Sequence, residues 1–394
     1  MADRFEIGVL GGGQLARMTM LAAHRLGVTI ASYDPDPHGP AAQVGPTVVG
    51  ALTDPDAMAA FLSRCDRAVL DSEFVPVCTI RAAMKQAGFP PNRLVPDDAF
   101  LAVIQDKLAQ RQLYRVAGVP SPEARGLYGE SAPPRAYPVV LKSRFGGYDG
   151  KGTRVIRTRE DWDAAVEIRA AGDWLEEDFV PFRHEVAVMV ARTPTETVAY
   201  RPVITVQPNL VCEYTVPYDG SSELIQRAQT VAIAAVEAIG AAVGLFGVEL
   251  FLTATGEFVV NEIAPRPHNT GHATMDDAGT SQFEQLVRIA TGLPLGPVVE
   301  SPTVGMANLL GPGDGSADGA SDPERLRAAR ASVGGVEPFA RVHWYGKQQV
   351  RAGRKLGHIN VPGIVSLANL PRLRAAADAF WRGYGTAASG ASGS

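Results

Sequence analysis

The segment from Gly247 to His272 constrains the fold most, because two alternating apolar runs in it flank an Ala-Thr-Gly turn, as in a β-hairpin. If the turn is centred on Thr255 and Gly256 with a loop of about two or four residues, Glu249 lies opposite Glu262. Like charges in that position repel each other. Mg²⁺ would relieve the repulsion, since it takes carboxylates and substrate phosphates as ligands. The hairpin therefore predicts an Mg-nucleotide site, and the alternative is two solvated acids on an exposed strand face.

Length, charge and cysteine content narrow the class of protein. A chain of 394 residues exceeds one ordinary core and should divide into two or three domains. Its net charge of -5 argues against a nucleic-acid partner held by phosphate neutralisation. The N-terminus lacks the apolar core of a secretory signal and no run is long enough to span a bilayer, so we expect a cytoplasmic protein with no membrane partner. Cys65, Cys78 and Cys212 lack a metal-ligand spacing and predict ordinary thiols in a reducing compartment.

Lysine is rare, with six among the 37 basic residues. Because arginine is otherwise preferred, a lysine indicates a place that needs a compact ammonium rather than a planar guanidinium. All but Lys85 lie in segments that other features single out, namely Lys107, Lys142, Lys151, Lys347 and Lys355.

The first hundred residues alternate between strand and helix patterns. A strand at Phe5 to Leu10 leads through a glycine-rich turn into a helix that ends near Leu26, and a second strand follows at Val28 to Tyr33. This is a βαβ unit. With a further strand at Ala68 to Asp71, it predicts a doubly wound α/β domain.

The middle of the chain reads as a second domain. The pattern predicts one helix over Asp98 to Ala117, a strand over Pro138 to Lys142, a mobile loop over Gly146 to Gly152, another strand edge over Trp174 to Val180, and a helix over about Ser221 to Ala242 before the hairpin. The polar segment from 311 to 322 predicts an exposed loop. We expect four regions, at 1–100, 101–300, 301–384 and a disordered tail at 385–394.

Gly11, Gly13 and Ala16 fit the Gly-x-Gly-x-x-Ala dinucleotide fingerprint after a strand, and Asp34 ends the next strand, where an acid would bind ribose. Free amides at a helix N-terminus attract any phosphate. The turn is therefore compatible with NAD or FAD, with another phosphorylated ligand, or with a structural role alone.

A second glycine-rich stretch runs from Arg144 to Gly152, with Lys151 at its tip and Lys142 on the strand before it. Glycines let the backbone approach a ligand closely, and a lysine supplies charge for a phosphate. The Walker pattern is absent from the sequence, so this is another type of phosphate loop, or else a flexible turn. Lys107 starts the preceding helix, where the alternative is a solvated lysine.

These features occur in the order expected of an ATP-grasp ligase, and further motifs resemble the N5-carboxyaminoimidazole ribonucleotide synthase family over residues 6 to 362. The most specific is Pro-Arg-Pro-His-Asn-Thr-Gly-His. The motifs are Gly11 to Met18, Phe145 to Gly152, Asn261 to His272, Thr280 to Gln285, His343 to Lys347 and Gly353 to His358. The resemblance implies an α/β (α+β) ATP-grasp fold that follows a Rossmann-like domain and precedes a small C-terminal domain. It also implies a homodimer that carboxylates 5-aminoimidazole ribonucleotide with ATP, Mg²⁺ and bicarbonate, through carboxyphosphate, in purine biosynthesis.

By the same resemblance, Lys107 and Lys142 hold ATP phosphates, the glycine loop closes over them, and Glu185 takes the ribose hydroxyls. Glu249 and Glu262 hold Mg²⁺. The implied ATP-binding residues are Lys107, Lys142, Gly147, Tyr148, Asp149, Gly150, Lys151, Gly152, Thr153, Glu177, Asp178, Phe179, Val180, Glu185, Gln207, Asn261 and Glu262.

Arg266 and His268 follow the metal strand closely, where a guanidinium can hold the carboxyphosphate anion and an imidazole can hydrogen-bond or shuttle a proton. With Lys151 they form the implied catalytic set. The implied ribonucleotide-binding residues are Gly13, Gln14, Leu15, Glu73, Tyr148, Arg266, Lys347, Arg351, Arg354 and Lys355.

Two positions depart from the family pattern. A second acid usually follows Glu73 two residues on, but Val75 stands there, and Gln207 occupies a position where many relatives have histidine. Three alternatives stay open: another ATP-grasp ligase such as the formate-dependent glycinamide ribonucleotide transformylase, a nucleotide-dependent oxidoreductase, and a catalytically inactive sensor of a purine intermediate.

Overall fold

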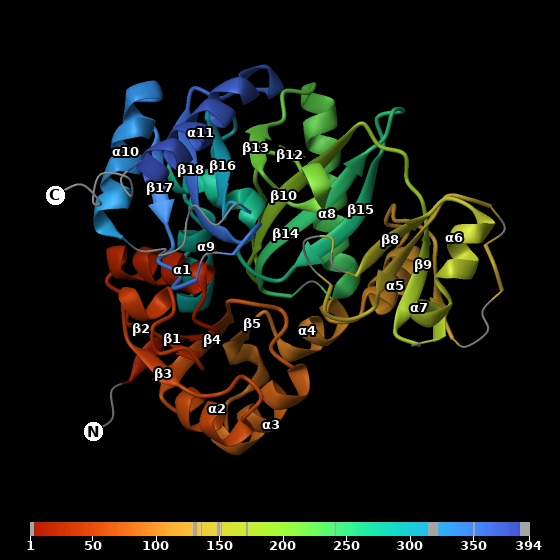
Figure 1. The fold of residues 1–394 in the computed structure, drawn as a ribbon. Helices are drawn as coiled ribbons and strands as arrows, with labels where there is room; N and C mark the ends of the chain where they lie inside the picture. Colours follow the sequence, from red (N-terminus) through yellow and green to blue (C-terminus); the bar gives the residue numbers. More distant parts are fainter. Residues whose placement is uncertain are drawn as a thin grey trace.

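The computed structural model (Figure 1) holds an α/β chain built on three sheets. It describes residues 4–128, 132–134, 136–147, 150, 152–170, 172–240, 242–313, 322–349 and 351–386. Among these, no helix is both long and apolar enough to cross a bilayer. All three cysteines are free thiols, with Cys65 and Cys212 buried and Cys78 exposed.

The first domain is a five-stranded sheet in the order β3-β2-β1-β4-β5, and every pair is parallel. The strands are β1 Phe5–Leu10, β2 Ile30–Asp34, β3 Thr47–Val49, β4 Cys65–Leu70 and β5 Leu94–Val95. The helices and short turns are α1 Gln14–Arg25, η1 Ala41–Gln43, α2 Pro55–Leu62, α3 Val77–Ala87, η2 Pro91–Arg93 and α4 Asp98–Ile104. The doubly wound prediction is confirmed, because helices cover both faces and keep the strands buried.

The prediction of a single helix over Asp98 to Ala117 is wrong. It is divided into α4 and α5 Lys107–Ala117, with Gln105 and Asp106 between them. The Asp106 carboxylate accepts hydrogen bonds from the amides of Leu108 and Ala109, which makes it the N-cap of a new helix. Lys107 is therefore the first residue of α5, as expected.

A four-stranded antiparallel sheet in the order β6-β9-β7-β8 follows, seen on the right in Figure 1. Its elements are β6 Ala124–Leu127, β7 Val139–Ser143, β8 Thr153–Ile156, α6 Arg159–Ala164, α7 Val166–Ala170 and β9 Trp174–Asp178. The strand expected at Trp174 is present, but it is not at an edge, since β9 pairs with β6 on one side and β7 on the other. A buried Trp162 from α6 packs with Leu141 of β7 and Leu127 of β6.

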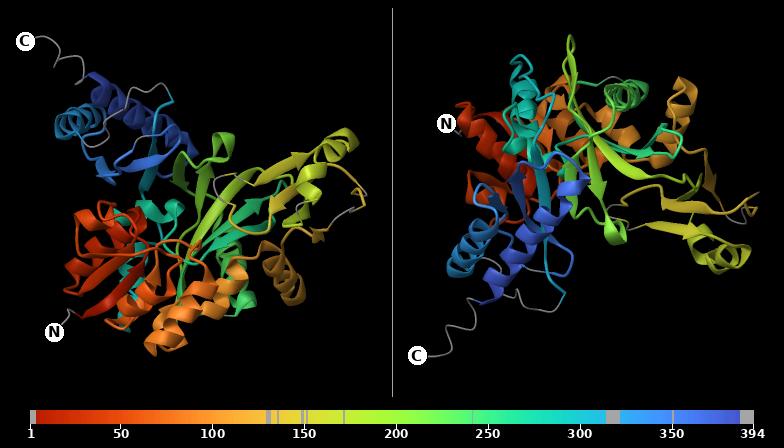
Figure 2. Two further views of the ribbon diagram at one scale, coloured as in Figure 1. Left: turned by 60° about the horizontal axis from the view of Figure 1, so that its bottom comes forward. Right: turned by 90° about the horizontal axis from the view of Figure 1, so that it is seen from above.

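The largest sheet has nine strands, in the order β15-β14-β10-β12-β13-β16-β18-β17 with β11 beside β10. Its strands are β10 His184–Arg192, β11 Thr197–Ala199, β12 Val203–Val206, β13 Tyr214–Pro217, β14 Gly244–Leu252, β15 Phe258–Ala264, β16 Val304–Leu310, β17 Arg341–Trp344 and β18 Lys355–Pro362. Because β13 pairs with β16, one sheet joins the middle of the chain to its C-terminal part, as both views of Figure 2 show.

Helices cover this sheet, and its core contains residues from β10, β14, β15 and β18. The remaining elements are η3 Pro208–Leu210, α8 Ser222–Ile239, η4 Asn269–Met275, α9 Gln282–Thr291, α10 Pro323–Val336, η5 Leu367–Asn369 and α11 Leu370–Thr386. The expected helix before the hairpin is α8. Helix α11 extends past Gly385, so the tail expected from 385 begins inside it, whereas residues 387–394 and 314–321 lie outside the described part.

The predicted hairpin is β14 and β15, and Glu249 pairs directly with Glu262. The predicted loop length is wrong. Leu252 pairs with Phe258, and the Thr253 amide donates to the Glu257 carbonyl, so the strand pairing next to the turn is shifted by one residue from the predicted register. A β-bulge between Glu249 and Leu250 corrects the register. It leaves Asn261 as the extra residue, so that Asn261 and Glu262, although consecutive, line the same cavity.

Candidate active site

Two adjoining cavities lie where the first domain, the two antiparallel sheets and the C-terminal strands meet. The larger encloses about 1020 Å³ and the smaller about 340 Å³. Each has a size suited to a small-molecule substrate. The residues that line both cavities are Lys107, Gly147, Glu262, His268, Asn269 and Lys355. A reaction between groups bound in the two cavities would therefore take place beside Glu262 and His268.

A buried charge network forms one wall of the smaller cavity. The Glu177 carboxylate accepts from Arg111 Nε at 2.7 Å and from Lys142 Nζ at 2.9 Å. Lys142 also donates to Asn261 Oδ1 at 2.9 Å, and Arg111 donates to the Asn261 carbonyl. Glu177 is 2% exposed. The network thus fixes the ammonium of Lys142 and ties the four-stranded sheet to the bulge of β15.

The charges in this network are held strongly. Burial raises the pKa of Glu177, but Arg111 and Lys142 more than offset this and lower it to about 2. Two cations face one anion, so a net positive charge is left for an anionic ligand such as a phosphate. Sequence reasoning missed Arg111, although its place one turn after Lys107 on α5 would have put both on one helix face.

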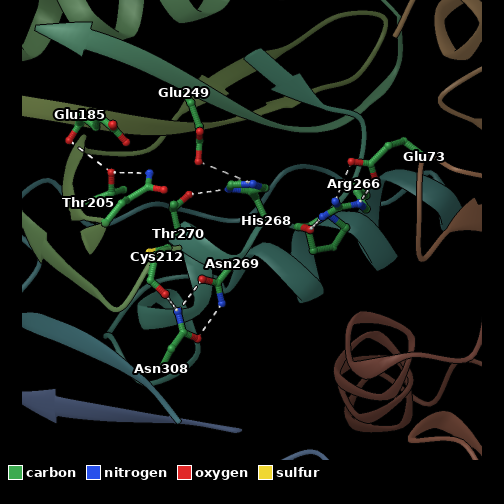
Figure 3. Close-up of polar contacts among 12 residues, drawn as sticks. Glu73, Glu185, Thr205, Cys212, Glu249, Arg266, His268, Asn269, Thr270 and Asn308 are labelled. Atoms are coloured by element: carbon green, nitrogen blue, oxygen red, sulfur yellow. Dashed lines mark hydrogen bonds and ion pairs between the residues drawn. The ribbon is translucent and has the colours of Figure 1, made fainter. Parts of the chain in front are cut away.

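The acids of the nine-stranded sheet share one face. Glu249 and Glu262 are direct cross-strand partners, and Glu185 on β10 pairs with Phe251, two residues from Glu249, so all three point to the same side. Figure 3 shows Glu185 and Glu249 on the same strand layer, with His268 below Glu249. All three acids line the smaller cavity.

These donors fit a divalent metal that brings further ligands with it. Within the described residues, no group of three or more His, Cys, Asp or Glu could hold a metal ion. Two facing carboxylates with Asn261 beside them are, however, the few protein oxygens that Mg²⁺ uses when phosphates and water complete its coordination. Glu249 also lies 3.8 Å from the Nε2 atom of His268.

Glu185 is distinguished by its electrostatic environment. Burial and the neighbouring Glu262 charge raise its pKa to about 7. Gln207, one of the two departures from the family pattern, donates to Thr205 at 3.1 Å and hydrogen-bonds Glu185. The glutamine therefore takes part in the polar network of the smaller cavity, which it also lines.

The phosphate-loop residues can be placed only in part. Lys107 donates to the Gly147 carbonyl at 3.4 Å. Tyr148, Asp149 and Lys151 lie outside the described residues. The remaining expected ATP contacts that line the smaller cavity are Gly150, Gly152, Thr153, Asp178, Phe179 and Val180.

The larger cavity holds the expected carboxylation residues. The Arg266 guanidinium forms a two-point ion pair with Glu73, through Nε to Oε2 and through Nη2 to Oε1 at 2.8 Å. Figure 3 places this pair beside His268. Glu73 follows β4 of the first domain, so the pair links that domain to the loop after β15. Val75, at the position of the missing second acid, is 1% exposed and packs in the core of the first domain.

His268 is a neutral imidazole. Burial, with the nearby Arg266 and Lys355 charges, lowers its pKa to about 3. Its Nδ1 atom lies 2.8 Å from the Thr270 hydroxyl. The next residue, Asn269, exchanges two hydrogen bonds with Asn308 of β16, at 2.7 and 2.9 Å, and these anchor the loop to the C-terminal strands (Figure 3).

Four basic residues of the C-terminal part, Lys347, Arg351, Arg354 and Lys355, also line the larger cavity. Lys347 donates to the Lys355 carbonyl at 2.8 Å, and Arg354 donates to the Gln349 carbonyl at 2.8 Å. Burial and the neighbouring Arg351 lower the pKa of Arg354. Four cations that line the same cavity can neutralise a phosphate monoester.

The glycine-rich turn is not a free anion site. Asp34 accepts from the Gly12 amide at 2.7 Å, and Asp71 accepts from the amides of Gly13 and Ala16 at 3.1 and 2.6 Å. A Cβ at Gly13 would lie 2.5 Å from the Asp71 carboxylate. The chain's own acids therefore bind the amides expected to hold a phosphate, and Asp34 is engaged away from the role of a ribose ligand. Gln14 and Leu15 line the larger cavity.

Three family models match the chain. They are the ribonucleotide synthetase preATP-grasp domain at residues 5–105, the ATP-grasp domain at 130–283, and the phosphoribosylaminoimidazole carboxylase C-terminal domain at 305–364. The fold and the cavity between its two antiparallel sheets define an ATP-grasp ligase.

Individual relatives agree with this class. The N5-carboxyaminoimidazole ribonucleotide synthases of Synechococcus elongatus and Mycobacterium tuberculosis are each 38% identical to the chain, over 91% and 96% of it and 89% and 88% of the relative. A crystal structure of an N5-carboxyaminoimidazole ribonucleotide synthetase with ADP aligns with a TM-score of 0.83 and 31% identity, covering 97% of this chain and 98% of that one. The synthase of Aspergillus clavatus with ADP and 5-aminoimidazole ribonucleotide aligns with a TM-score of 0.82 and 29% identity, over 97% and 100%. The chain belongs to the N5-carboxyaminoimidazole ribonucleotide synthase family.

Proposed function

We propose that this ligase uses ATP, Mg²⁺ and bicarbonate to carboxylate the exocyclic amine of 5-aminoimidazole ribonucleotide, giving N5-carboxyaminoimidazole ribonucleotide for purine biosynthesis. The observation that carries the proposal is the continuity of one segment. Glu262 and His268 each line both cavities, and only five residues separate them. The segment from Asn261 to His268 can therefore couple phosphate transfer in the smaller cavity to carboxylation in the larger one.

ATP binds in the smaller cavity. The network around Glu177 orients Lys142 toward the phosphates, Lys107 adds a second ammonium, and residues Phe179 and Val180 lie beside the adenine. Glu185 accepts hydrogen bonds from the ribose hydroxyls. Glu249 and Glu262 would hold Mg²⁺, which neutralises charge on the transferring phosphoryl group when it is bound.

The chemistry balances in two steps. A bicarbonate oxygen attacks the γ-phosphorus, the bond from that phosphorus to ADP breaks, and carboxyphosphate forms. The amine nitrogen then bonds to the carboxyl carbon, transferred directly or after release as CO₂, while the carbon–oxygen bond to phosphate breaks and inorganic phosphate leaves. The amine loses one proton.

Arg266 and His268 have different roles in the second step. The guanidinium supplies the positive charge that holds the carboxyphosphate anion, and Glu73 aligns it through two parallel contacts. His268 is neutral, so it can accept a proton from the amine, which a protonated imidazole cannot do. Anionic substrates nearby favour the protonated form and raise its basicity as the complex assembles.

The ribonucleotide enters the larger cavity. Lys347, Arg351, Arg354 and Lys355 would bind its phosphate, and the imidazole would lie beside Gln14 and Leu15 between the first domain and the C-terminal strands. The occupied amides of the glycine-rich turn support this arrangement, because the chain's own acids repel a dinucleotide pyrophosphate there.

We further propose, from the family resemblance of the motifs, that the chain acts as a homodimer in the cytoplasm, with functional regions at 1–100, 101–300 and 301–384. Sedimentation of the purified chain tests the dimer.

ADP release tests the reaction. We expect it to depend on bicarbonate together with 5-aminoimidazole ribonucleotide, in assays that supply bicarbonate, formate or neither, each with and without the ribonucleotide. Dependence on formate, or absence of ADP in every condition, would overturn the proposal.

A further inference from the structure

Helix α9 carries two buried glutamines to which the proposed function assigns no role. Gln282 and Gln285 are each 0% exposed. Both belong to the Thr280 to Gln285 motif, which lies outside the cavities described above. An uncharged amide with no exposure must satisfy its donors and acceptor internally, so its partners show what it holds in place.

Each glutamine clamps the main chain of one residue. Gln282 Oε1 accepts from the His268 amide at 2.8 Å, and its Nε2 donates to the His268 carbonyl at 2.9 Å. Gln285 makes the same pair of contacts with Gly296, at 2.9 and 2.7 Å. Gly296 lines neither active-site cavity, whereas His268 lines both. The two clamps are alike in chemistry, burial and helix, and differ in what they hold.

The remaining amide hydrogen of Gln282 determines the tautomer of the His272 imidazole. Because the His268 amide can only donate, the atom facing it must be the oxygen of Gln282, and the nitrogen therefore faces His272 Nδ1 at 2.9 Å. A glutamine nitrogen only donates, so His272 Nδ1 accepts and its proton is on Nε2. Burial lowers the pKa of His272 well below its ordinary value, consistent with this neutral form.

The surrounding residues make room for the clamp and support it. A Cβ at Gly271 would lie 2.6 Å from Gln282 Oε1, so glycine is required there. The Thr274 hydroxyl accepts from the Gln282 amide at 3.0 Å, which satisfies a donor in the first turn of α9. Behind Gln282, Leu286 and Ala290 pack in a core that includes Ile7 of the first domain. The catalytic loop is thus fastened to a helix that bridges two domains.

We infer that Gln282 is a positioning residue for carboxylation, which holds the backbone of His268 on both sides and so sets the imidazole between the two cavities. This inference rests on the proposed function. Loss of the clamp should misplace His268 without changing the ATP contacts. The signature is a lower kcat, a smaller yield of carboxylated product per ADP, and an unchanged ATP KM.

The test compares Gln282→Met with the matched variant Gln285→Met. A misplacement of about 1 Å costs roughly 100-fold in rate, so we expect kcat of Gln282→Met to fall by about that factor, while Gln285→Met stays near wild type. Gln282→Glu keeps the acceptor for the His268 amide and should fall between them, and it carries the test if the methionine variant does not fold. Equal effects at positions 282 and 285, or a rise in ATP KM matching the loss in kcat, would overturn the inference.

A readout independent of turnover separates this inference from the proposed function. The ¹⁵N chemical shifts of His272 should report an Nε2-protonated ring in the wild type and a changed tautomer balance in Gln282→Met. If wild-type enzyme released no bicarbonate-dependent ADP, the proposed function would fail while the ring shifts still tested the clamp. Unchanged shifts in Gln282→Met would refute the clamp itself.

Discussion

Neutralising Glu177 should destabilise the protein far more than neutralising its neighbour. The change Glu177→Gln removes the anion that Arg111 and Lys142 share at 2.7 and 2.9 Å. Arg111 and Glu177 are 4% and 2% exposed, so solvent cannot replace the lost charge. Breaking a buried pair by removing one partner costs about 3–5 kcal/mol, because a buried charge is left without compensation.

The lowered pKa of Glu177 arises from the same interaction. Its value of about 2, against an ordinary 4.5, corresponds to about 3 kcal/mol. The folded-state pKa is depressed, so this stabilisation is present above pH 4.5 and is lost as the pH falls through about 2. At neutral pH the full effect should appear in the variant.

Urea unfolding at pH 7 measures the free energy of unfolding, with Glu176→Gln as the matched control. Glu176 is adjacent in β9, but its partner Arg125 has a side chain that is 42% exposed, and such pairs contribute about 0–1 kcal/mol. Combining Glu177→Gln with Arg111→Met should recover part of the loss, since one unpaired cation is removed. A loss of unfolding free energy in Glu177→Gln no larger than that in Glu176→Gln would show that the buried charges need no such compensation.

Three further outcomes follow from the site. Glu262→Gln should lower turnover at least about 100-fold at any Mg²⁺ concentration. Its melting temperature should not fall, because the substitution relieves the repulsion between Glu249 and Glu262. Wild-type rates at limiting Mg²⁺ would exclude Glu262 as a metal ligand, and Glu257→Gln in the hairpin turn is the control. Lys347→Ala should raise the ribonucleotide KM about 10-fold or more and leave the ATP KM unchanged, and equal rises would mean that the basic residues bind another ligand. The free energy of unfolding should fall as the pH is lowered from 6.5 to 4.5, because buried histidines with depressed pKa values stay neutral in the folded protein and gain protons on unfolding. Each such histidine contributes a loss of about 1.4 kcal/mol per pH unit. These histidines are His268, His272 and His358. Glu185, with its pKa raised to about 7, has the opposite sign and offsets one of them, so a urea midpoint that stays constant or rises on acidification through this window would contradict the neutral assignments.

Local patterns predicted the elements, because burial periodicity and turn chemistry are encoded in adjacent residues. The parallel first domain and the hairpin are examples. The facing of Glu249 and Glu262 was predicted correctly although the loop length was wrong, since the bulge near Asn261 compensates for it. A bulge depends on cross-strand packing, which the alternation of apolar residues does not reveal.

Contacts between distant segments could not be predicted from the sequence. Asp71 looked like the end of a strand, yet it binds the amides of the glycine-rich turn 55 and 58 residues away. Arg111 reaches Asn261 across 150 residues. Gln282 belonged to a recognised motif, but its clamp on His268 depends on how α9 docks against the loop after β15. Each of these is a tertiary interaction between polar groups, and no local periodicity marks it.

The coupling role of the segment from Asn261 to His268 is tested most directly by the ratio of carboxylated product to ADP. Carbamate formed from ¹³C-bicarbonate can be measured by NMR alongside ADP, in wild type and in His268→Gln. The wild type should give one carbamate per ADP. The variant should continue to release ADP, because the smaller cavity keeps Lys142, Glu249 and Glu262, but should yield well under one carbamate for each. A ratio that stays at one in His268→Gln, at whatever rate, would contradict the coupling.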